Sequence, residues 1–187
     1  RAADTAHLAA ATVADALQAM DYKLAAADFF DTLEVSAEAA VVQSLALENG
    51  INFYYPTEGS VRMSFDEVTT PEEVAEVIRI FATAKGRKAK AVKPVTESRV
   101  PAALRRRTAY LSEAVFNTYR SESDLMRYIK KLELRDISLA NSMISLGSCT
   151  MKLNAAALMQ PLSLAGFQMM HPFAPADQAE GYMQLIK

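Results

Sequence analysis

Hydrophobic and polar residues repeat with two different periods along the first half of the chain. Between residues 3 and 20 apolar residues recur at helical spacing, with Ala9, Val13 and Leu17 on one face. The next apolar segment, FFDTLEV at 29–35, is rich in aromatic and β-branched residues, which are typical of strands. The pattern therefore predicts an amphipathic helix followed by a strand.

A second helix is predicted directly after this strand. Ser36 stands where an N-cap belongs, and Val42 and Leu45 lie on one face of the helix that would follow. The pair Asn49-Gly50 should end this helix, because both residue types tolerate the left-handed backbone conformation found at helix C-termini.

Two strands and a third helix complete this half. Residues 51–55 and 61–66 alternate apolar with polar side chains, and the five residues 56–60 between them have the composition of a hairpin turn. The segment TTPEEVAEVIRIF then begins a helix, in which Thr70 can cap and Glu73 can complete a capping box.

The predicted order is α-β-α-β-β-α, so we expect an α/β (α+β) domain in which helices pack on one three-stranded sheet. We expect residues 1–85 to fold independently. The phenylalanines of this domain are interpreted as core residues, while Tyr54 and Tyr55 can also reach outward from a strand edge. The core phenylalanines are Phe29, Phe30, Phe53, Phe65 and Phe81.

The second half of the chain is less regular. The segment KGRKAKAVKP at 85–94 is strongly basic, which suits either an anion-binding face or a solvated linker; the linker is favoured because no aromatic residues are interleaved. Ser121 should cap a helix with Leu125 and Ile129 on one face. Residues 140–187 lose periodicity and are rich in methionine, so we expect them to pack on a surface outside this sequence.

Composition and charge exclude several classes of protein. The chain has 187 residues, a net charge of −2 and one cysteine, so neither a nucleic-acid partner nor an intrachain disulfide is indicated. No apolar run approaches the roughly 18 residues of a membrane span. The first residues, RAADTAHL, lack an initiator methionine and already have helical character, and we interpret the chain as an internal fragment.

The segment GSCTMKLN at 147–154 holds the densest chemistry. A nucleophilic Cys149 would need a base such as His171, but no local signature supports that pair, and one cysteine with two distant histidines does not make a metal site. Backbone amides and hydroxyls here could form a nest for a phosphate or carboxylate, assisted by Lys152. A simple glycine turn leading into a helix at 154–159 explains the composition equally well.

Four longer motifs share a common resemblance. SMISLGSCTMKLN at 142–154, HPFAPADQAEGY at 171–182, FNTYRSESDLMRYIKKLE at 116–133 and FFDTL at 29–33 all resemble the P-protein family of the glycine cleavage system. The similarity runs along the chain in the family's order.

The resemblance implies a fold, a cofactor and partners. Family members are pyridoxal-phosphate enzymes of fold type I that decarboxylate glycine, with the cofactor ring as electron sink, and pass the aminomethyl group to the lipoyl group of H-protein. It implies that residues 1–95 are the small α/β domain closing the first half of a single-chain P-protein, that 96–140 are a connector with one helix, and that 141–187 are the extended N-terminal arm of the second, cofactor-binding half. A homodimeric parent and a bacterial cytoplasmic location, or the mitochondrial matrix in a eukaryote, are also implied.

The resemblance also suggests roles for individual residues. Ser148, Cys149 and Thr150 would contact the cofactor, and Lys152, Asn154 and His171 would contact the substrate. The family's Schiff-base lysine follows a histidine; here His7 precedes Leu8 and His171 precedes Pro172, so no catalytic residue is assigned in this chain. We expect the chain alone to be inactive and not to attach the cofactor covalently.

The chain also departs from the family's usual residues. The family usually has threonine and glutamate at Ala156 and Leu158, often Trp-Pro-Glu at 164–166 where Leu164, Ala165 and Gly166 stand, and commonly histidine at Asn141. Two other interpretations stay open: a non-catalytic domain for assembly or H-protein docking, and a fragment of another fold type I decarboxylase.

Overall fold

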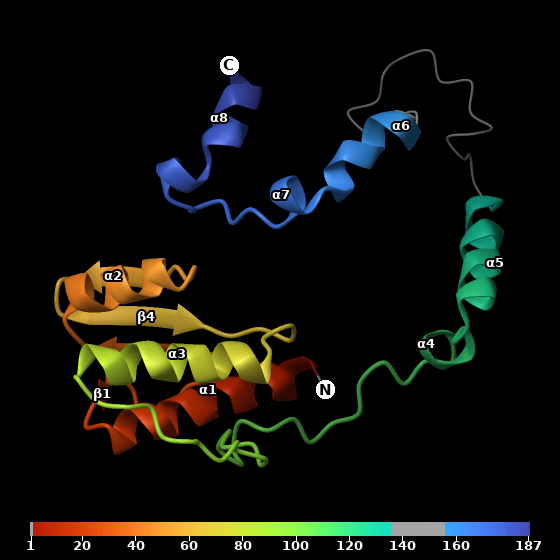
Figure 1. Cartoon of the computed structure of the whole chain (residues 1–187). Helices are drawn as coiled ribbons and strands as arrows, with labels where there is room; N and C mark the ends of the chain where they lie inside the picture. The colour runs from red at the N-terminus through yellow and green to blue at the C-terminus, as the bar shows by residue number, and fades with distance from the viewer. Residues whose placement is uncertain (1, 136–155) are drawn as a thin grey trace. The chain divides into compact units, whose positions relative to one another are not determined.

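The computed structural model describes residues 2–135 and 156–187 (Figure 1). The chain divides into two compact units, Arg1–Arg106 and Arg107–Lys187.

The first unit contains three helices and four strands. In chain order they are α1 (Ala2–Ala19), β1 (Lys23–Leu24), β2 (Thr32–Ser36), α2 (Ala39–Glu48), β3 (Tyr54–Thr57), β4 (Ser60–Ser64) and α3 (Pro71–Ala84). The mixed α/β composition predicted from the sequence is confirmed.

The sheet has four strands rather than the predicted three. Its order is β1-β2-β4-β3 and every neighbouring pair is antiparallel. The additional strand, β1, pairs Lys23 with Ser36 and Leu24 with Val35. Two residues are too few to show the period-2 alternation by which a strand is recognised in a sequence.

Alternation along the central strands places one face of the sheet against the helices. Leu33 pairs with Met63 and Val35 with Val61, and all four side chains are buried. Phe81 of α3 packs in the same core cluster. Helix α3 contacts both α1 and α2, so the three helices form a layer with α3 in the middle (Figure 1).

Two strand boundaries differ from the prediction. Strand β2 begins at Thr32 rather than at residue 29, and Phe30, expected in the core, is 46% exposed. The hairpin loop has two residues, because Thr57 already pairs with Ser60. A loop of this length matches the twist of antiparallel strands better than the five-residue connector that was predicted.

Helix beginnings were predicted with mixed success. Thr70 caps α3 as expected: its hydroxyl accepts the backbone N–H of Glu73 at 3.2 Å, and the Glu73 carboxylate accepts the backbone N–H of Thr70 at 2.7 Å. The predicted cap of α2 was wrong. Ser36 pairs within β2, and the residue before α2, Glu38, makes no side-chain cap hydrogen bond.

All three helices of the first unit end with the same cap. The residue after the cap adopts a positive φ, which is 62° at Asp21, 69° at Gly50 and 64° at Gly86. The following amide then donates back into the helix, as from Tyr22 to the Leu17 carbonyl at 3.0 Å. This is the Schellman motif. Two of the three positions are glycines, which adopt a positive φ without strain, whereas Asp21 is not.

The basic segment after α3 is mostly exposed, as a solvated linker would be, but it also runs along the surface of α1. Arg87 pairs with Asp21 at 3.0 Å, and the Val95 amide donates to the Thr12 hydroxyl at 3.0 Å. Arg99 then forms an ion pair with Asp15. We call residues 87–106 the strap.

The second unit consists of short helices. They are α4 (Val115–Thr118), α5 (Glu122–Glu133), α6 (Ala156–Met159), η1 (Gln160–Ser163), α7 (Ala165–Gln168), η2 (Ala176–Gln178) and α8 (Glu180–Ile186). Ser121 caps α5 as predicted, accepting the Asp124 amide at 3.1 Å. The described part of the arm was expected to be extended, but it forms helical turns.

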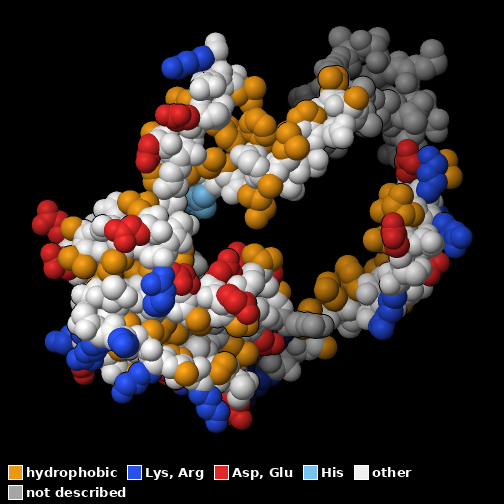
Figure 2. Space-filling model, viewed as in Figure 1, with side chains coloured by type: hydrophobic (Ala, Val, Ile, Leu, Met, Phe, Trp, Pro, Cys, Tyr) orange, Lys and Arg blue, Asp and Glu red, His pale blue; other side chains and the backbone are white. Residues whose placement is uncertain are grey.

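Apolar side chains of this unit are exposed. On α5, Leu125, Ile129 and Leu132 are each more than two-fifths exposed. In 156–187, Met169 is 76% and Phe173 88% exposed. Figure 2 shows these hydrophobic side chains along both segments.

Candidate functional site

The candidate site predicted from the sequence falls in two parts of the chain. Ser148, Cys149, Thr150, Lys152 and Asn154 lie outside the described residues, as does Asn141. His171 lies inside them. Their proposed roles therefore stay predictions, and the local geometry can be given for His171 alone.

His171 is exposed and its ring is oriented by the backbone that follows it. The Phe173 amide donates to His171 Nδ1 at 3.1 Å. A ring nitrogen that accepts an N–H carries no proton, so the neutral ring has its proton on Nε2. The Phe173 ring lies 5.8 Å from the imidazole, centroid to centroid. His171 therefore presents an N–H donor, suited to an anionic or carbonyl oxygen.

The segment that carries His171 is closed by a contact between α7 and α8. The Tyr182 hydroxyl donates to the Phe167 carbonyl at 2.7 Å, and the two rings meet edge to face at 5.4 Å. These contacts join residues on either side of the HPFAP segment. The loop is thus shaped by its own residues, although most of its apolar side chains are exposed.

The positions that depart from the family pattern lie in the same region. Ala156 begins α6, and Leu158 on that helix is 73% exposed. Leu164 is 55% exposed and precedes Ala165 and Gly166, the first two residues of α7. Leu158 stands where the family usually has glutamate, so the surface at this position is more apolar than the resemblance implies.

His7, the other histidine, has a structural role. It is 1% exposed; Nδ1 lies 2.7 Å from the Phe30 carbonyl, and Nε2 accepts the Arg99 amide at 2.9 Å. The Nδ1–H tautomer satisfies both contacts at once. Its ring also stacks on Phe30 at 5.5 Å. One sequence feature points to this role, a lone histidine among the alanines of an amphipathic helix.

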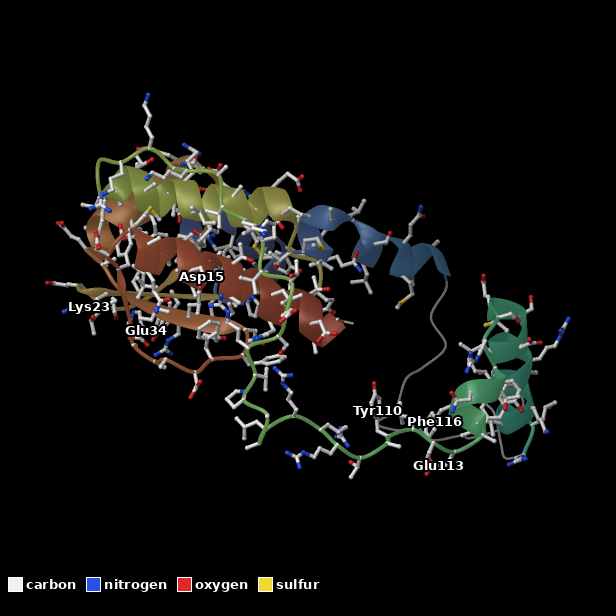
Figure 3. All side chains as sticks on the ribbon, turned by 90° about the horizontal axis from the view of Figure 1, so that it is seen from below. Asp15, Lys23, Glu34, Tyr110, Glu113 and Phe116 are labelled. Atoms are coloured by element: carbon white, nitrogen blue, oxygen red, sulfur yellow. The ribbon has the colours of Figure 1, made fainter. Side chains whose placement is uncertain are left out.

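The face of the sheet away from the helices is polar. Arg62 and Glu34, opposite each other on β4 and β2, form an ion pair at 2.6 Å, and the guanidinium also lies over the Tyr54 ring at 5.6 Å. Glu34 and Lys23 are labelled on this part of the unit in Figure 3. Such exposed cross-strand pairs contribute little stability and define no site by themselves.

The described residues form neither a metal centre nor a membrane span. Residues 2–135 and 156–187 contain no group of three or more His, Cys, Asp or Glu placed to hold a metal ion. Within the same ranges, no helix has both the length and the apolar character needed to cross a bilayer.

The chain is similar to known proteins along nearly its whole length. Residues 1–81 match the family model described as glycine cleavage system P-protein. Proteins named glycine dehydrogenase (decarboxylating) align over 99% of the chain: 48% identity in Flavobacterium johnsoniae, 44% in Christiangramia forsetii and 41% in Thermosynechococcus vestitus. The chain spans about a fifth of the length of these relatives.

Proposed function

Because the chain belongs to the glycine cleavage system P-protein family, we propose that it works as part of a glycine dehydrogenase (decarboxylating). The observation that carries the proposal is 48% identity over 186 residues to a relative of that name. In this proposal the whole protein decarboxylates glycine and transfers the aminomethyl group to lipoylated H-protein. It acts in the cytoplasm as a homodimer.

The part played by this chain is to supply polar groups to a site completed by other residues. Pyridoxal phosphate, when bound, would supply the electron sink for loss of the glycine carboxyl group. Ser148, Cys149 and Thr150 are the groups that would hold the cofactor's polar atoms. Lys152 and Asn154, on the same short segment, would hold the substrate carboxylate, because an ammonium and an amide both donate hydrogen bonds to anions.

The geometry of His171 fits this role. Its Nδ1 accepts the Phe173 amide, so Nε2–H is left to donate to a substrate oxygen. The donor set suits binding and orientation but not covalent attachment, since no lysine follows a histidine in the sequence. We therefore assign no catalytic residue to residues 1–187.

A chimera tests the proposal. The aligned segment of the Flavobacterium johnsoniae relative is replaced by this chain, and glycine-dependent release of carbon dioxide is measured with lipoylated H-protein. We expect activity within about tenfold of the relative, because two proteins 48% identical share core and site geometry. A chimera that folds and binds the cofactor but releases no carbon dioxide would contradict the proposal.

Matched variants of the chimera test the assigned residues. Ser148→Ala and Lys152→Ala should each lower the rate about tenfold or more, because each removes a hydrogen-bond donor that is assigned to holding the cofactor or the substrate. Ser163→Ala and Lys131→Ala are the controls; both side chains are exposed and lie outside the motif. Equal rates in the motif variants and the controls would make GSCTMKLN a packing segment.

A further inference from the structure

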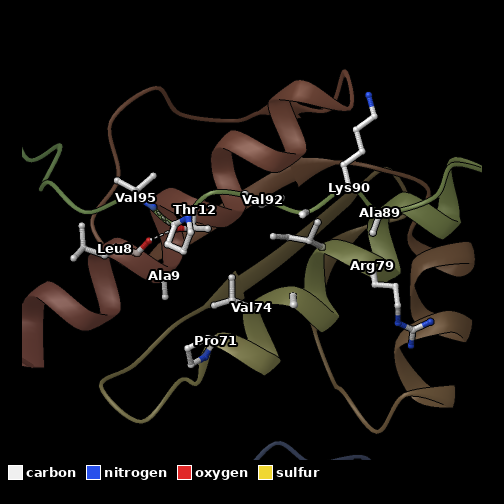
Figure 4. A pocket seen from close by; sticks show the side chains of 14 residues that line it. Leu8, Ala9, Thr12, Pro71, Val74, Arg79, Ala89, Lys90, Val92 and Val95 are labelled. Carbon is white, nitrogen blue, oxygen red and sulfur yellow. Dashed lines mark hydrogen bonds between the residues drawn. The ribbon is translucent and has the colours of Figure 1, made fainter.

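A cavity of about 560 Å³ lies within the first unit, between α1, α3 and the strap (Figure 4). Its volume is that of a small-molecule site and is far larger than a packing defect. Leu8 and Ala9 of α1, Val74 and Ile78 of α3, and Val92 of the strap are among the aliphatic residues that line it.

The strap is fixed on both sides of this cavity. Before it, Arg87 pairs with Asp21 beyond the end of α1, and after it the Val95 amide donates to the Thr12 hydroxyl. Between these anchors Val92 packs against the core of the unit. A segment tethered at both ends cannot easily settle onto the helices, so the space beneath it is retained.

The charged residues that line the cavity are both cationic. Its lining contains two cationic residues, Arg79 and Lys90, and no carboxylate. Arg79 is already paired with Glu76, and this pairing lowers the pKa of the Glu76 carboxyl. Lys90 is exposed and its side chain extends away from the cavity floor (Figure 4). Its flexible stem can bring the ammonium over the opening, as lysines do at apolar surfaces.

The sequence of the strap combines aliphatic residues with positive charge. Ala89, Lys90, Ala91 and Val92 line the cavity, and Val92 is the one of these that is partly buried; Lys88 and Lys93, on either side of them, are exposed. These lysines form no ion pair within the described ranges. An aliphatic floor under a cationic edge is complementary to a molecule with an aliphatic chain and a single anionic head.

We propose that this cavity binds an aliphatic carboxylate, with the chain between α1 and α3 and the carboxylate against the strap lysines. The cavity lining shares no residue with the groups assigned to glycine decarboxylation, and the proposal does not depend on them. Saturated rather than aromatic chains are favoured, because the lining has no aromatic residue with which a ring could stack.

The experiment titrates the 187-residue chain with decanoate and follows methyl resonances by NMR, with hexanoate and decanol as comparisons. We expect saturable shifts at Val74, Ile78 and Val92. Decanoate should bind more tightly than hexanoate, through its longer chain, and more tightly than decanol, through its charge. Non-saturable shifts, or equal affinities for decanoate and decanol, would overturn the proposal.

Variants locate the binding. Ala9→Phe places a ring in the cavity and should abolish the shifts, whereas Ala40→Phe, at an exposed position on α2, should leave them unchanged. Replacing Lys88, Lys90 and Lys93 by glutamine should weaken decanoate binding roughly three- to tenfold. Unchanged affinity in Ala9→Phe would refute the site. Shifts of the same methyls on raising the protein concentration alone would show that a second copy occupies the cavity instead.

Discussion

A substitution at His7 is the sharpest test of how the first unit holds the strap. The imidazole satisfies two main-chain groups that are distant in sequence, the Phe30 carbonyl and the Arg99 amide. His7→Leu keeps apolar bulk at this position but removes both partners. Each polar group deprived of its partner in a buried setting costs about 1–3 kcal/mol.

For each of the two groups the cost should lie in the lower part of that range, at about 1–1.5 kcal/mol. Phe30 and Arg99 are exposed residues, so water can partly replace the lost contacts. We therefore expect His7→Leu to lower the free energy of unfolding by about 2–3 kcal/mol, measured by urea titration followed by tyrosine fluorescence. Arg99, whose pKa is raised by its hydrogen bond to Asp15, stays charged and keeps one tether on the strap.

Two conservative variants separate the contacts. His7→Asn places its amide near the position of Nδ1 and can keep the bond to Phe30, whereas His7→Gln reaches the position of Nε2 and can keep the bond to Arg99. Amide exchange at Arg99 should accordingly be fast in the asparagine and leucine variants and slow in the glutamine variant. If the free energy of unfolding of His7→Leu lies within about 0.5 kcal/mol of that of the unchanged protein, and exchange of the Arg99 amide is unaltered, His7 does not hold residues 30 and 99 as described.

Three further outcomes follow from the first unit. Tyr22→Phe should cost about 1 kcal/mol, because the phenol donates to the Phe81 carbonyl at 2.8 Å, whereas Tyr55→Phe should be neutral or stabilising, since the Tyr55 hydroxyl is buried with no partner among the described residues; urea titration compares the two. Asp21→Gly should stabilise by up to about 1 kcal/mol, because relief of the positive φ outweighs loss of the exposed Asp21–Arg87 ion pair, and a lower midpoint of thermal unfolding would contradict this. Burial raises the pKa of Tyr22, so the folded state holds this proton more tightly and stability should fall as pH rises above about 10; Tyr22→Phe should lessen that fall in alkaline titrations.

The parts of the fold that were predictable are those specified by neighbouring residues. The capping box at Thr70, the cap at Ser121 and the left-handed Gly50 each depend on a few consecutive residues, and all three are confirmed. Strand β1 was missed because it exists only through its pairing with β2. The start of α2 was misplaced because Ser36 is used by the sheet, so that a tertiary contact overrode a local preference.

The candidate site shows the same division. Residue types and order along GSCTMKLN and HPFAP were enough to suggest the family, which the similarity to named relatives supports. The orientation of His171 was not predictable, because it is set by a backbone amide two residues later. The structure describes none of the residues 147–154, so their roles depend on the variants proposed above.

The polar residues of α1 explain why the first unit extends to Arg106 instead of ending with α3. A helix rich in alanine allows close approach, and its buried His7 and Thr12 would be costly if their polar atoms had no partners. Each side chain accepts a hydrogen bond from a backbone amide of the strap, so that donor and acceptor both have a partner when they are buried. A chain cut near residue 90 would lose both amides and leave two acceptors at a newly exposed surface. The strap therefore belongs to the folded unit, and its course sets the cavity beneath it.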